Sequence, residues 1–449
     1  MSQRAANLKN QISNAIFGVL DYLAYPLGML AIAPLALRSL GTDRYGIWMI
    51  AVSTISTGAI VASGFGDANI RIVAMQRATG NHENVIRAVR STMGIHLFLG
   101  CALAIAGWIL APMAAIKLVR ATSGLRADCL WTLRIACLLI PVRAIESVCV
   151  STQRAYERYG SALRISAIAR LVCLACAGVL PFIAHTVVSI LVATLLISAY
   201  GVWLQIAQLR TLLDADDLLP ALDRETTRAL LSFGVFAWIQ AVSGLVFGQL
   251  DRLIAGIAFG AAAVAAYSIC VQMSQPIYGL VAAGLHFLFP RLSVQHALDD
   301  RAGVRRTVLL GFCANLLIVV LGASVVLAFG PAILSRLAGV ELAHQCAPLL
   351  PVIVWSTAFS GLGVAGAYSM LALGRAKTLT CFTLAGGILM SISMSWLARR
   401  YGLQGMAWSR MLYGPITCMV YIPLVVFLNS RSKCRSYSAF STALYEEAQ

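Results

Sequence analysis

Residues 63–90 read SGFGDANIRIVAMQRATGNHENVIRAVR and hold four arginines, in a chain of 449 residues that is 59% hydrophobic and only 12% charged. The mean hydropathy of the whole chain is +0.82, which a water-soluble domain of this length does not tolerate. The sequence therefore predicts a polytopic membrane protein. Within it, residues 63–90 predict a cationic elbow held at a membrane surface between two spans.

The hydropathy of the remaining chain predicts the number of spans. A bilayer core about 30 Å thick needs roughly 20 apolar residues per helix, which leaves room for about twelve helices. The first six are expected near residues 12–37, 45–66, 91–116, 130–152, 165–184 and 187–209. The second six are expected near residues 229–259, 264–290, 307–330, 346–373, 378–397 and 405–428. The expected fold class is all-α, with little chain left for a soluble domain.

The distribution of lysine and arginine predicts the orientation, because cationic loops resist translocation. With the N-terminus in the cytoplasm, 22 of the 34 basic residues fall on the cytoplasmic side, 8 fall outside and 4 lie within spans. Both termini are therefore expected in the cytoplasm, although Arg399 and Arg400 fall on the outer side. The apolar stretch behind the cationic N-terminus runs to about Leu37 without a cleavage site, which predicts an uncleaved first span.

The charge and the cysteines exclude other classes of function. The net charge of +16 comes from arginines scattered singly in short loops, without the interleaved aromatic residues of polyanion-binding proteins, so no nucleic-acid partner is expected. Most of the twelve cysteines lie in apolar stretches and are expected to pack there. Cys173 and Cys176 form a CxxC, but no histidine or second CxxC is nearby, and neither a metal nor a cofactor is expected.

The elbow has a second copy. Residues 76–87 align with residues 295–306 at an offset of 219. The same offset pairs Gln76 with Gln295, Ala78 with Ala297, Val85 with Val304, Arg87 with Arg306, Gly41 with Gly260 and Trp48 with Tyr267. We therefore expect two six-helix halves, residues 1–214 and 215–449. An even number of helices per half makes the repeats parallel, a recurrent plan of transporters.

Polar residues inside the spans predict where a substrate passes, because ionisable groups in a membrane normally face a cavity or one another. One face of the first span carries Asn14, Asp21 and Tyr25, and one face of the seventh carries Gln240, Ser243 and Asp251. These faces predict the walls of a hydrated cleft between the halves.

The charged residues leave two readings of this cleft open. Arg143 and Arg252 would bind the pyrophosphate of a lipid-linked substrate, whereas Asp21 and Asp251 would attract a cationic drug. Ion pairing is an alternative for two of these sites. Asp251 precedes Arg252, and Arg143 stands three residues before Glu146, so that the last two are neighbours on one helix face.

The eighth span adds aromatic and hydroxyl groups. Tyr267, Ser274 and Tyr278 share a face that predicts contact with a sugar, while anchoring at the membrane interface explains Tyr267 equally well. Pro26 and Pro276 lie in spans with other polar residues and are the best candidates for hinges.

Several motifs resemble one family of membrane proteins. LGTDRYGIWMI (residues 40–50) and SGFGDANIRIVAMQRATGN (63–81) resemble the start of bacterial polysaccharide flippases, in the multidrug, oligosaccharidyl-lipid and polysaccharide exporter superfamily. LDRLIAGIAFGAAAVAAYSICVQMSQPI (250–277) with LFPRLS (288–293) is similar to the second-half signature, and YGLQGMAWSR (401–410) to the entry of the last helix. The resemblance covers essentially the whole chain.

The resemblance implies a V-shaped bundle of twelve helices in the bacterial inner membrane. It implies that undecaprenyl-pyrophosphate-linked oligosaccharide units for O-antigen or exopolysaccharide move between leaflets by alternating access. Membrane lipids and a polysaccharide polymerase or chain-length machinery are the implied partners. Flippases of this family tend to have cationic central cavities. This chain matches that feature approximately, through Arg143 and Arg252.

Two other functions remain as alternatives. Asp21 and Asp251 favour an exporter of drugs or toxins coupled to H⁺ or Na⁺. A membrane enzyme acting on lipid-linked donors would need an outward-facing catalytic site, but the longest outer loop, residues 331–345, contains no carboxylate pair, activated nucleophile or metal cluster. A transporter is therefore expected rather than an enzyme.

Overall fold

The computed structural model describes residues 2–78, 80–119, 123–156, 159–215, 217–285, 288–298 and 300–429, which are helical nearly throughout and contain no strand. The first helices are α1 (Ser2–Ala62), α2 (Gly66–Ala78), α3 (His82–Leu118), α4 (Ser123–Ala155), α5 (Tyr159–Ala184) and α6 (Val187–Leu213). They are followed by α7 (Arg224–Leu245), the π-helix η1 (Val246–Leu250), α8 (Asp251–Phe259), α9 (Ala261–Gly284), α10 (Leu288–Ala297) and α11 (Arg301–Ala338). The last are α12 (Val340–Cys346), α13 (Leu350–Ala372), α14 (Ala376–Arg410), α15 (Tyr413–Cys418) and α16 (Tyr421–Asn429).

Two of the long helices consist of two arms joined at a kink. α1 bends at Gly41 (φ 79°, ψ 170°) and α14 bends at Gly402 (φ 63°, ψ −147°). Glycine adopts a positive φ readily because it has no Cβ. For a count of long helical rods, each arm of α1 and α14 is one rod, α7 to α8 form one rod, and the second arm of α14 to α16 forms another. The short helices α2, α10 and α12 are not counted. Among the described residues, six rods then precede residue 215 and six follow it. The division into two six-helix halves, residues 1–214 and 215–449, stays a prediction.

The helices have the length and the surface of membrane spans. Seven segments of the described residues are long and apolar enough to cross a bilayer: residues 28–62, 82–118, 164–184, 187–213, 301–336, 350–372 and 376–428. Large apolar side chains project outward from two of them, with Phe98 and Ile109 of α3 exposed by 68% and 69% and Phe329 of α11 by 61%. Such a surface requires hydrocarbon around it, and the chain is a polytopic all-α membrane protein.

Backbone features recur at the offset of 219 predicted from the sequence. Gly260 (φ 88°, ψ 178°) repeats the conformation of Gly41. After each elbow, the residue that caps the next helix makes the same contacts. The N–H of Asn81 donates to the main-chain oxygen of Gln76 (3.1 Å), and the N–H of Asp300 donates to that of Gln295 (3.0 Å). Both caps also accept a main-chain N–H three residues later through a side-chain oxygen. The duplication therefore extends to the backbone.

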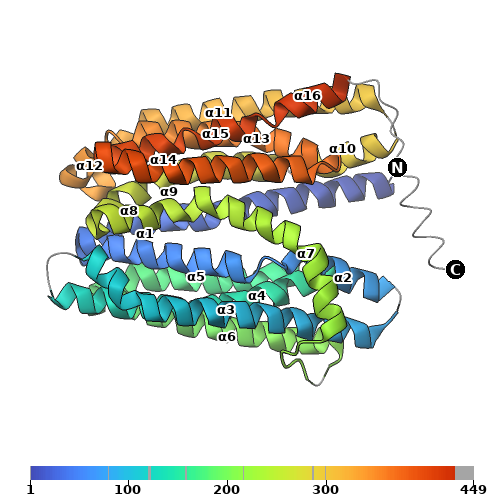
Figure 1. The fold of residues 1–449 in the computed structure, drawn as a ribbon, viewed down its shortest axis with the longest axis horizontal. Coiled ribbons are helices and arrows are strands. Elements are labelled where there is room, and N and C mark those ends of the chain that lie inside the picture. The colour runs from blue at the N-terminus through green and yellow to red at the C-terminus, as the bar shows by residue number, and fades with distance from the viewer. Residues whose placement is uncertain are drawn as a thin grey trace.

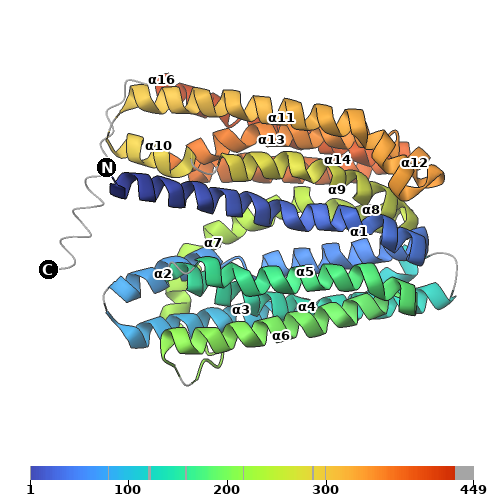
Figure 2. The same ribbon diagram turned by 180° about the vertical axis from the view of Figure 1, so that it is seen from behind.

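Figures 1 and 2 show two groups of helices lying side by side. The N-terminal bundle consists of the second arm of α1 with α2 to α6, and the C-terminal bundle consists of α8 to α16. Two segments cross between them: the start of α1 lies beside α9, and the start of α7 lies against α2 and α3. We name the end with Gly41 and Gly260 the outer end, and the end with the elbows α2 and α10 the inner end, after the orientation predicted from the charges.

Candidate functional site

At the outer end, the second arm of α1 and α9 pack closely where the two bundles meet. Gly46 lies so close to the main-chain oxygen of Ala261 that a Cβ would overlap it. Tyr45 is fully buried beside this contact, and its hydroxyl donates to Oε1 of Gln272 at 3.5 Å. The Nε2 of Gln272 lies 3.0 Å from Sδ of Met49. Small residues let helices approach in this way, and here they close the outer end of the interface.

A buried charged cluster is built around Asp251, the first residue of α8. Its carboxylate has no exposed surface. Its Oδ2 forms an ion pair with Nη1 of Arg410 on α14 and accepts a hydrogen bond from the hydroxyl of Tyr267 on α9 at 2.9 Å. The Nε of Arg410 donates to Oγ of Ser356 on α13 at 3.4 Å. Four helices of the C-terminal bundle therefore meet at one ion pair.

The π-helix η1 connects this cluster to the N-terminal bundle. Single π-turns interrupt α-helices rarely and are frequent at functional sites. The hydroxyl of Ser53 on the second arm of α1 lies 2.9 Å from the main-chain oxygen of Gln249 and 3.1 Å from its Oε1. The last turn before Asp251 is therefore held by the opposite bundle.

Arg252 has a different environment from its neighbour. Only 4% of the residue is exposed, and its Nε and Nη2 are buried without a hydrogen-bond partner in the part of the chain that the structure describes. Its main-chain N–H donates to Oδ1 of Asp251 at 2.7 Å, and its guanidinium lies within electrostatic reach of Tyr45 on α1. Arg252 therefore faces the interface between the bundles.

The charges of the cluster do not cancel. Among the side chains that the structure describes in this cluster, Arg252 and Arg410 supply two guanidinium groups against the carboxylate of Asp251, which leaves one positive charge in excess. An isolated buried charge is costly, and a guanidinium forms strong charge-assisted hydrogen bonds with phosphate or carboxylate oxygens. The arrangement is therefore chemically suited to an anionic group.

Arg143, which the sequence predicts for the same cleft, forms an ion pair within its own helix. Its Nη1 is 2.6 Å from Oε2 of Glu146 on the same helix, α4, and it lies near Cys173 of α5. The expected pair of neighbours is formed on α4, and the structure does not bring Arg143 to Asp251. The place of Arg143 in the cleft stays a prediction.

The eighth-span residues have different outcomes. Ser274 is fully buried: its hydroxyl donates to the main-chain oxygen of Val271 (2.9 Å) and accepts from Thr357 of α13 (3.2 Å). It joins two helices of the C-terminal bundle and does not line an open cavity, because helical spacing identifies a face but not what covers it. Tyr267 of the same face is buried on Asp251. Tyr278 is 37% exposed, and its contact with a sugar stays a prediction.

Five residues predicted to line the cleft lie on described helices, but the structure does not describe their side chains. They are Asn14, Asp21 and Tyr25 on α1 and Gln240 and Ser243 on α7. Their role stays a prediction. In the described ranges, no group of three histidine, cysteine, aspartate or glutamate residues is placed to hold a metal ion.

Arg410 is the member of the cluster that the sequence patterns do not single out. It is one of four arginines within the predicted spans, and that position is the only signal it gives. Its partner Asp251 is 159 residues away in the chain. The pairing follows from the packing of α8 against α14, which a single sequence does not reveal.

A second polar cluster holds the N-terminal bundle together. The Nδ2 of Asn69 on α2 donates to the hydroxyls of Ser151 (2.8 Å) and Thr152 (2.9 Å) on α4, and its Oδ1 accepts from Thr92 of α3 (3.1 Å). All four residues are buried. Every polar atom of the Asn69 amide group thus has a partner, and the cluster is structural.

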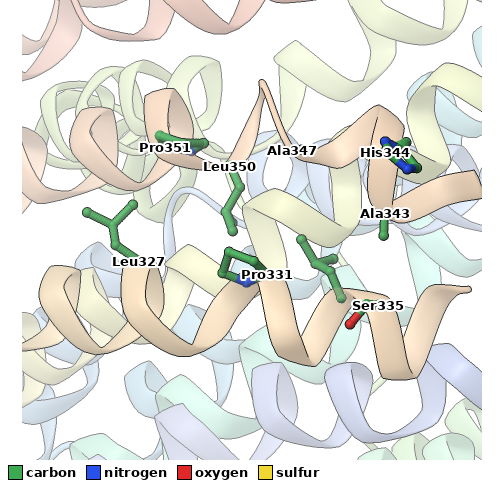
Figure 3. A pocket seen from close by; sticks show the side chains of 9 residues that line it. Leu327, Pro331, Ser335, Ala343, His344, Ala347, Leu350 and Pro351 are labelled. Atoms are coloured by element: carbon green, nitrogen blue, oxygen red, sulfur yellow. The ribbon is translucent and has the colours of Figure 1, made fainter. Parts of the chain in front are cut away.

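An apolar pocket of about 270 Å³ lies apart from these clusters, between α11, α12 and α13. Figure 3 shows Leu327 and Pro331 on one wall, Leu350 and Pro351 on the other, and His344 toward one end. None of these residues belongs to the interface around Arg252, so the pocket is not part of the candidate site.

Comparison with known proteins gives matches to polysaccharide-related proteins. A family model described as polysaccharide biosynthesis protein matches residues 9–296. A Shigella flexneri protein named "Putative O-antigen transporter" is 21% identical over 409 residues, which cover 90% of this chain and 94% of that protein.

Solved transporter structures share the fold at low sequence identity. The lipid II flippase MurJ in an inward closed conformation is 13% identical, with a TM-score of 0.75, over 92% of this chain and 87% of that one. An inward-facing multidrug resistance transporter of the MATE family is 14% identical, with a TM-score of 0.71, over 92% of this chain and all of that one. An outward-facing member of the same family gives a TM-score of 0.58 at 13% identity. These likenesses establish the fold.

Proposed function

This chain belongs to the polysaccharide biosynthesis protein family, and from that membership we propose that it moves undecaprenyl-pyrophosphate-linked oligosaccharide units across the bacterial cytoplasmic membrane for surface polysaccharide biosynthesis. The relatives are named for transport and flipping, and the chain is a membrane transporter and not an enzyme. In this proposal both termini lie in the cytoplasm. A polysaccharide polymerase or chain-length machinery takes over the product on the other side.

The observation that carries the proposal is the buried guanidinium of Arg252. Its Nε and Nη2 have no partner in the described ranges, and it lies between the bundles, where a transported molecule would pass. A pyrophosphate supplies several oxygens that accept charge-assisted hydrogen bonds. The same anion would compensate the positive charge of Arg252, which the ion pair of Asp251 and Arg410 leaves uncompensated.

The alternative function, ion-coupled export of cationic drugs, needs a carboxylate that is free to attract a cation. Asp251 does not offer one, because its charge is compensated by Arg410 and its surface is fully buried. That alternative therefore depends on Asp21. The excess charge at Arg252 favours an anionic headgroup over a cation.

Alternating access gives the cluster a place in the cycle. Tyr45 and Gly46 close the outer end of the interface in this conformation. We therefore expect the lipid-linked pyrophosphate to reach Arg252 from the inner leaflet and to leave after the contact at Gly46 has opened. The differential affinity of the two conformations for substrate would drive the change.

The proposal is tested with Arg252→Met in liposomes that contain a fluorescent undecaprenyl-pyrophosphate oligosaccharide and a quencher outside. Loss of the charge-assisted hydrogen bonds should lower the transport rate by about 10- to 100-fold. Because the change also removes a costly buried charge, the thermal midpoint of the substrate-free protein should not fall.

Arg134→Met is the matched control. Arg134 lies over the rings of Trp108 (5.0 Å) and Trp131 (5.3 Å) and belongs to neither cluster, so transport should stay at the wild-type rate. Wild-type transport by Arg252→Met would contradict the proposal. If the wild-type protein exports a cationic dye but does not move the lipid-linked oligosaccharide, the result would support the drug-export alternative.

A further inference from the structure

α7 follows α6 in the chain, yet its first half packs on the bundle that α6 completes. Leu230 of α7 is fully buried in a cluster with Phe65 in the turn before α2, Ala68 in the first turn of α2 and Ile95 of α3. Figure 1 shows the start of α7 lying against α2 before the chain crosses toward α8. One helix therefore covers the inner end of the N-terminal bundle and then continues into the C-terminal bundle.

Trp238 adds a hydrogen bond and a ring stack to this contact. Its Nε1 donates to the main-chain oxygen of Val61 at 2.8 Å, across 177 positions of sequence. Its ring is stacked on Phe65, with centroids 6.4 Å apart and planes 11° apart. The ring also fills the space beside Gly64, where a Cβ would overlap Cδ1 of the indole. The turn that ends α1 is therefore shaped around this tryptophan.

Beyond Trp238 the chain reaches its second anchor through the π-turn η1. At Gly248, in the middle of η1, no atom of the described residues outside its two chain neighbours and the backbone of its own helix lies within 4 Å of the position that a Cβ would take. The next residues lead to Asp251, whose buried ion pair with Arg410 fixes α8 in the C-terminal bundle. Trp238 thus ties α7 to the N-terminal bundle, the ion pair ties α8 to the C-terminal bundle, and η1, which is hydrogen-bonded to Ser53, lies between them.

We propose that Trp238 is the latch of an inner gate, and that α7 swings away from Val61, Gly64 and Phe65 about η1 when the inner end opens. The identity of the molecule that this gate admits rests on the proposed function. The movement of α7 does not depend on it. The contacts of Trp238 and the apolar packing of Leu230 separate more easily than a buried ion pair, so α7 parts from the N-terminal bundle and stays joined to the C-terminal bundle at Asp251.

The test measures access to a cysteine behind the latch, in the substrate-free protein. Ala68 is fully buried in the cluster under α7, so in Ala68→Cys a soluble maleimide reaches the thiol only through the open form. Ala51→Cys is the matched control, since Ala51 is equally buried but belongs to the core at the outer end. Both positions lie in the tryptic peptide 45–71, which contains no native cysteine, so mass spectrometry reads them without removing the others.

The expected rates follow from the contacts that each variant removes, because labelling tracks the population of the open form. Trp238→Phe keeps an aromatic ring but loses the N–H donor, and labelling at Ala68→Cys should rise about fivefold. Trp238→Ala also loses the stack, and labelling should rise about thirtyfold. Gly64→Ala, which displaces the ring without altering it, should act in the same direction.

Labelling at Ala51→Cys should stay unchanged in all three variants. Equal rates at Ala68→Cys with and without Trp238, or equal acceleration at both cysteines, would overturn the latch. The assay contains no lipid-linked oligosaccharide. A labelling response in a protein that fails to move this substrate would therefore refute the proposed function and leave the latch standing.

Discussion

The ion pair between Asp251 and Arg410 makes a strong prediction about stability. The side chains are 0% and 3% exposed, and removing one partner leaves the other as an uncompensated buried charge. Such a loss typically costs about 3–5 kcal/mol, against about 0–1 kcal/mol for a pair at the surface. Arg410→Met and Asp251→Asn should therefore each lower the free energy of unfolding by about 3–5 kcal/mol.

The double variant distinguishes the charge from the shape. In the double variant, neither member of the pair is left as an uncompensated charge. The hydroxyl of Tyr267 donates to the native carboxylate at 2.9 Å, and the amide oxygen introduced by Asp251→Asn can still accept this hydrogen bond. The double variant should lose only about 1–2 kcal/mol, much less than the sum of the two single losses.

The measurement is the fraction of protein that stays monodisperse after heating in detergent, compared across the four members of the cycle. The single variants should lower the midpoint by roughly 5 °C or more, and the double variant by much less. Additive losses would refute the reasoning, because they would mean that neither group depends on the other. A smaller loss in Arg410→Met than in Asp251→Asn would show Arg252 turning to replace Arg410, and adding Arg252→Met should then remove the difference.

Three further predictions concern other parts of the structure. Asn69→Ala leaves three buried hydroxyls without their amide partner and should lower the free energy of unfolding by about 1–3 kcal/mol, measured by the same heating assay. Gly46→Val cannot fit against α9 and should open the outer end, which would appear as faster maleimide labelling at Ala51→Cys, whereas unchanged labelling would contradict the tight packing. Hydrogen bonds from the side chain and main chain of Thr226 hold the pKa of Asp223 below its ordinary value. The ionised Asp223 caps α7, so its stabilisation of the fold is fully present above the unfolded pKa of about 4. This stabilisation is lost as the pH falls through the lower pKa of the folded state. The difference in thermal midpoint between wild type and Asp223→Ala should therefore be present at neutral pH and vanish in acid.

The architecture was predictable because it depends on local patterns. Apolar length predicts the spans, and the four arginines of residues 63–90 predict the elbow. The offset of 219 predicts that Gly260 repeats Gly41, and the two share nearly the same φ and ψ. What no local pattern indicates is that α7 leaves its own half and packs beside Phe65, since any apolar helix face can be buried against either bundle.

The candidate site was predictable only in part. Asp251 and Arg252 stand out because charges are rare in spans, but the sequence does not show which of them has a partner. Adjacent residues point about 100° apart on a helix, so Asp251 faces Arg410 while Arg252 faces the interface. Ser274 lies on a polar face of its helix in the sequence pattern, as a residue that lines a cavity would. In the structure, the side chain of Thr357 covers it and donates a hydrogen bond to its hydroxyl.

The crossing of α7 has a consequence for how the protein is made. When the first 213 residues have left the ribosome, the surfaces around Ala68 and Ile95 that later receive Leu230 still lack their cover. They remain bare until the seventh span has been inserted, so the earlier helices complete their packing only with a segment translated after them. A nascent chain stalled before residue 224 should therefore be a substrate for membrane quality control, although it holds every helix from α1 to α6.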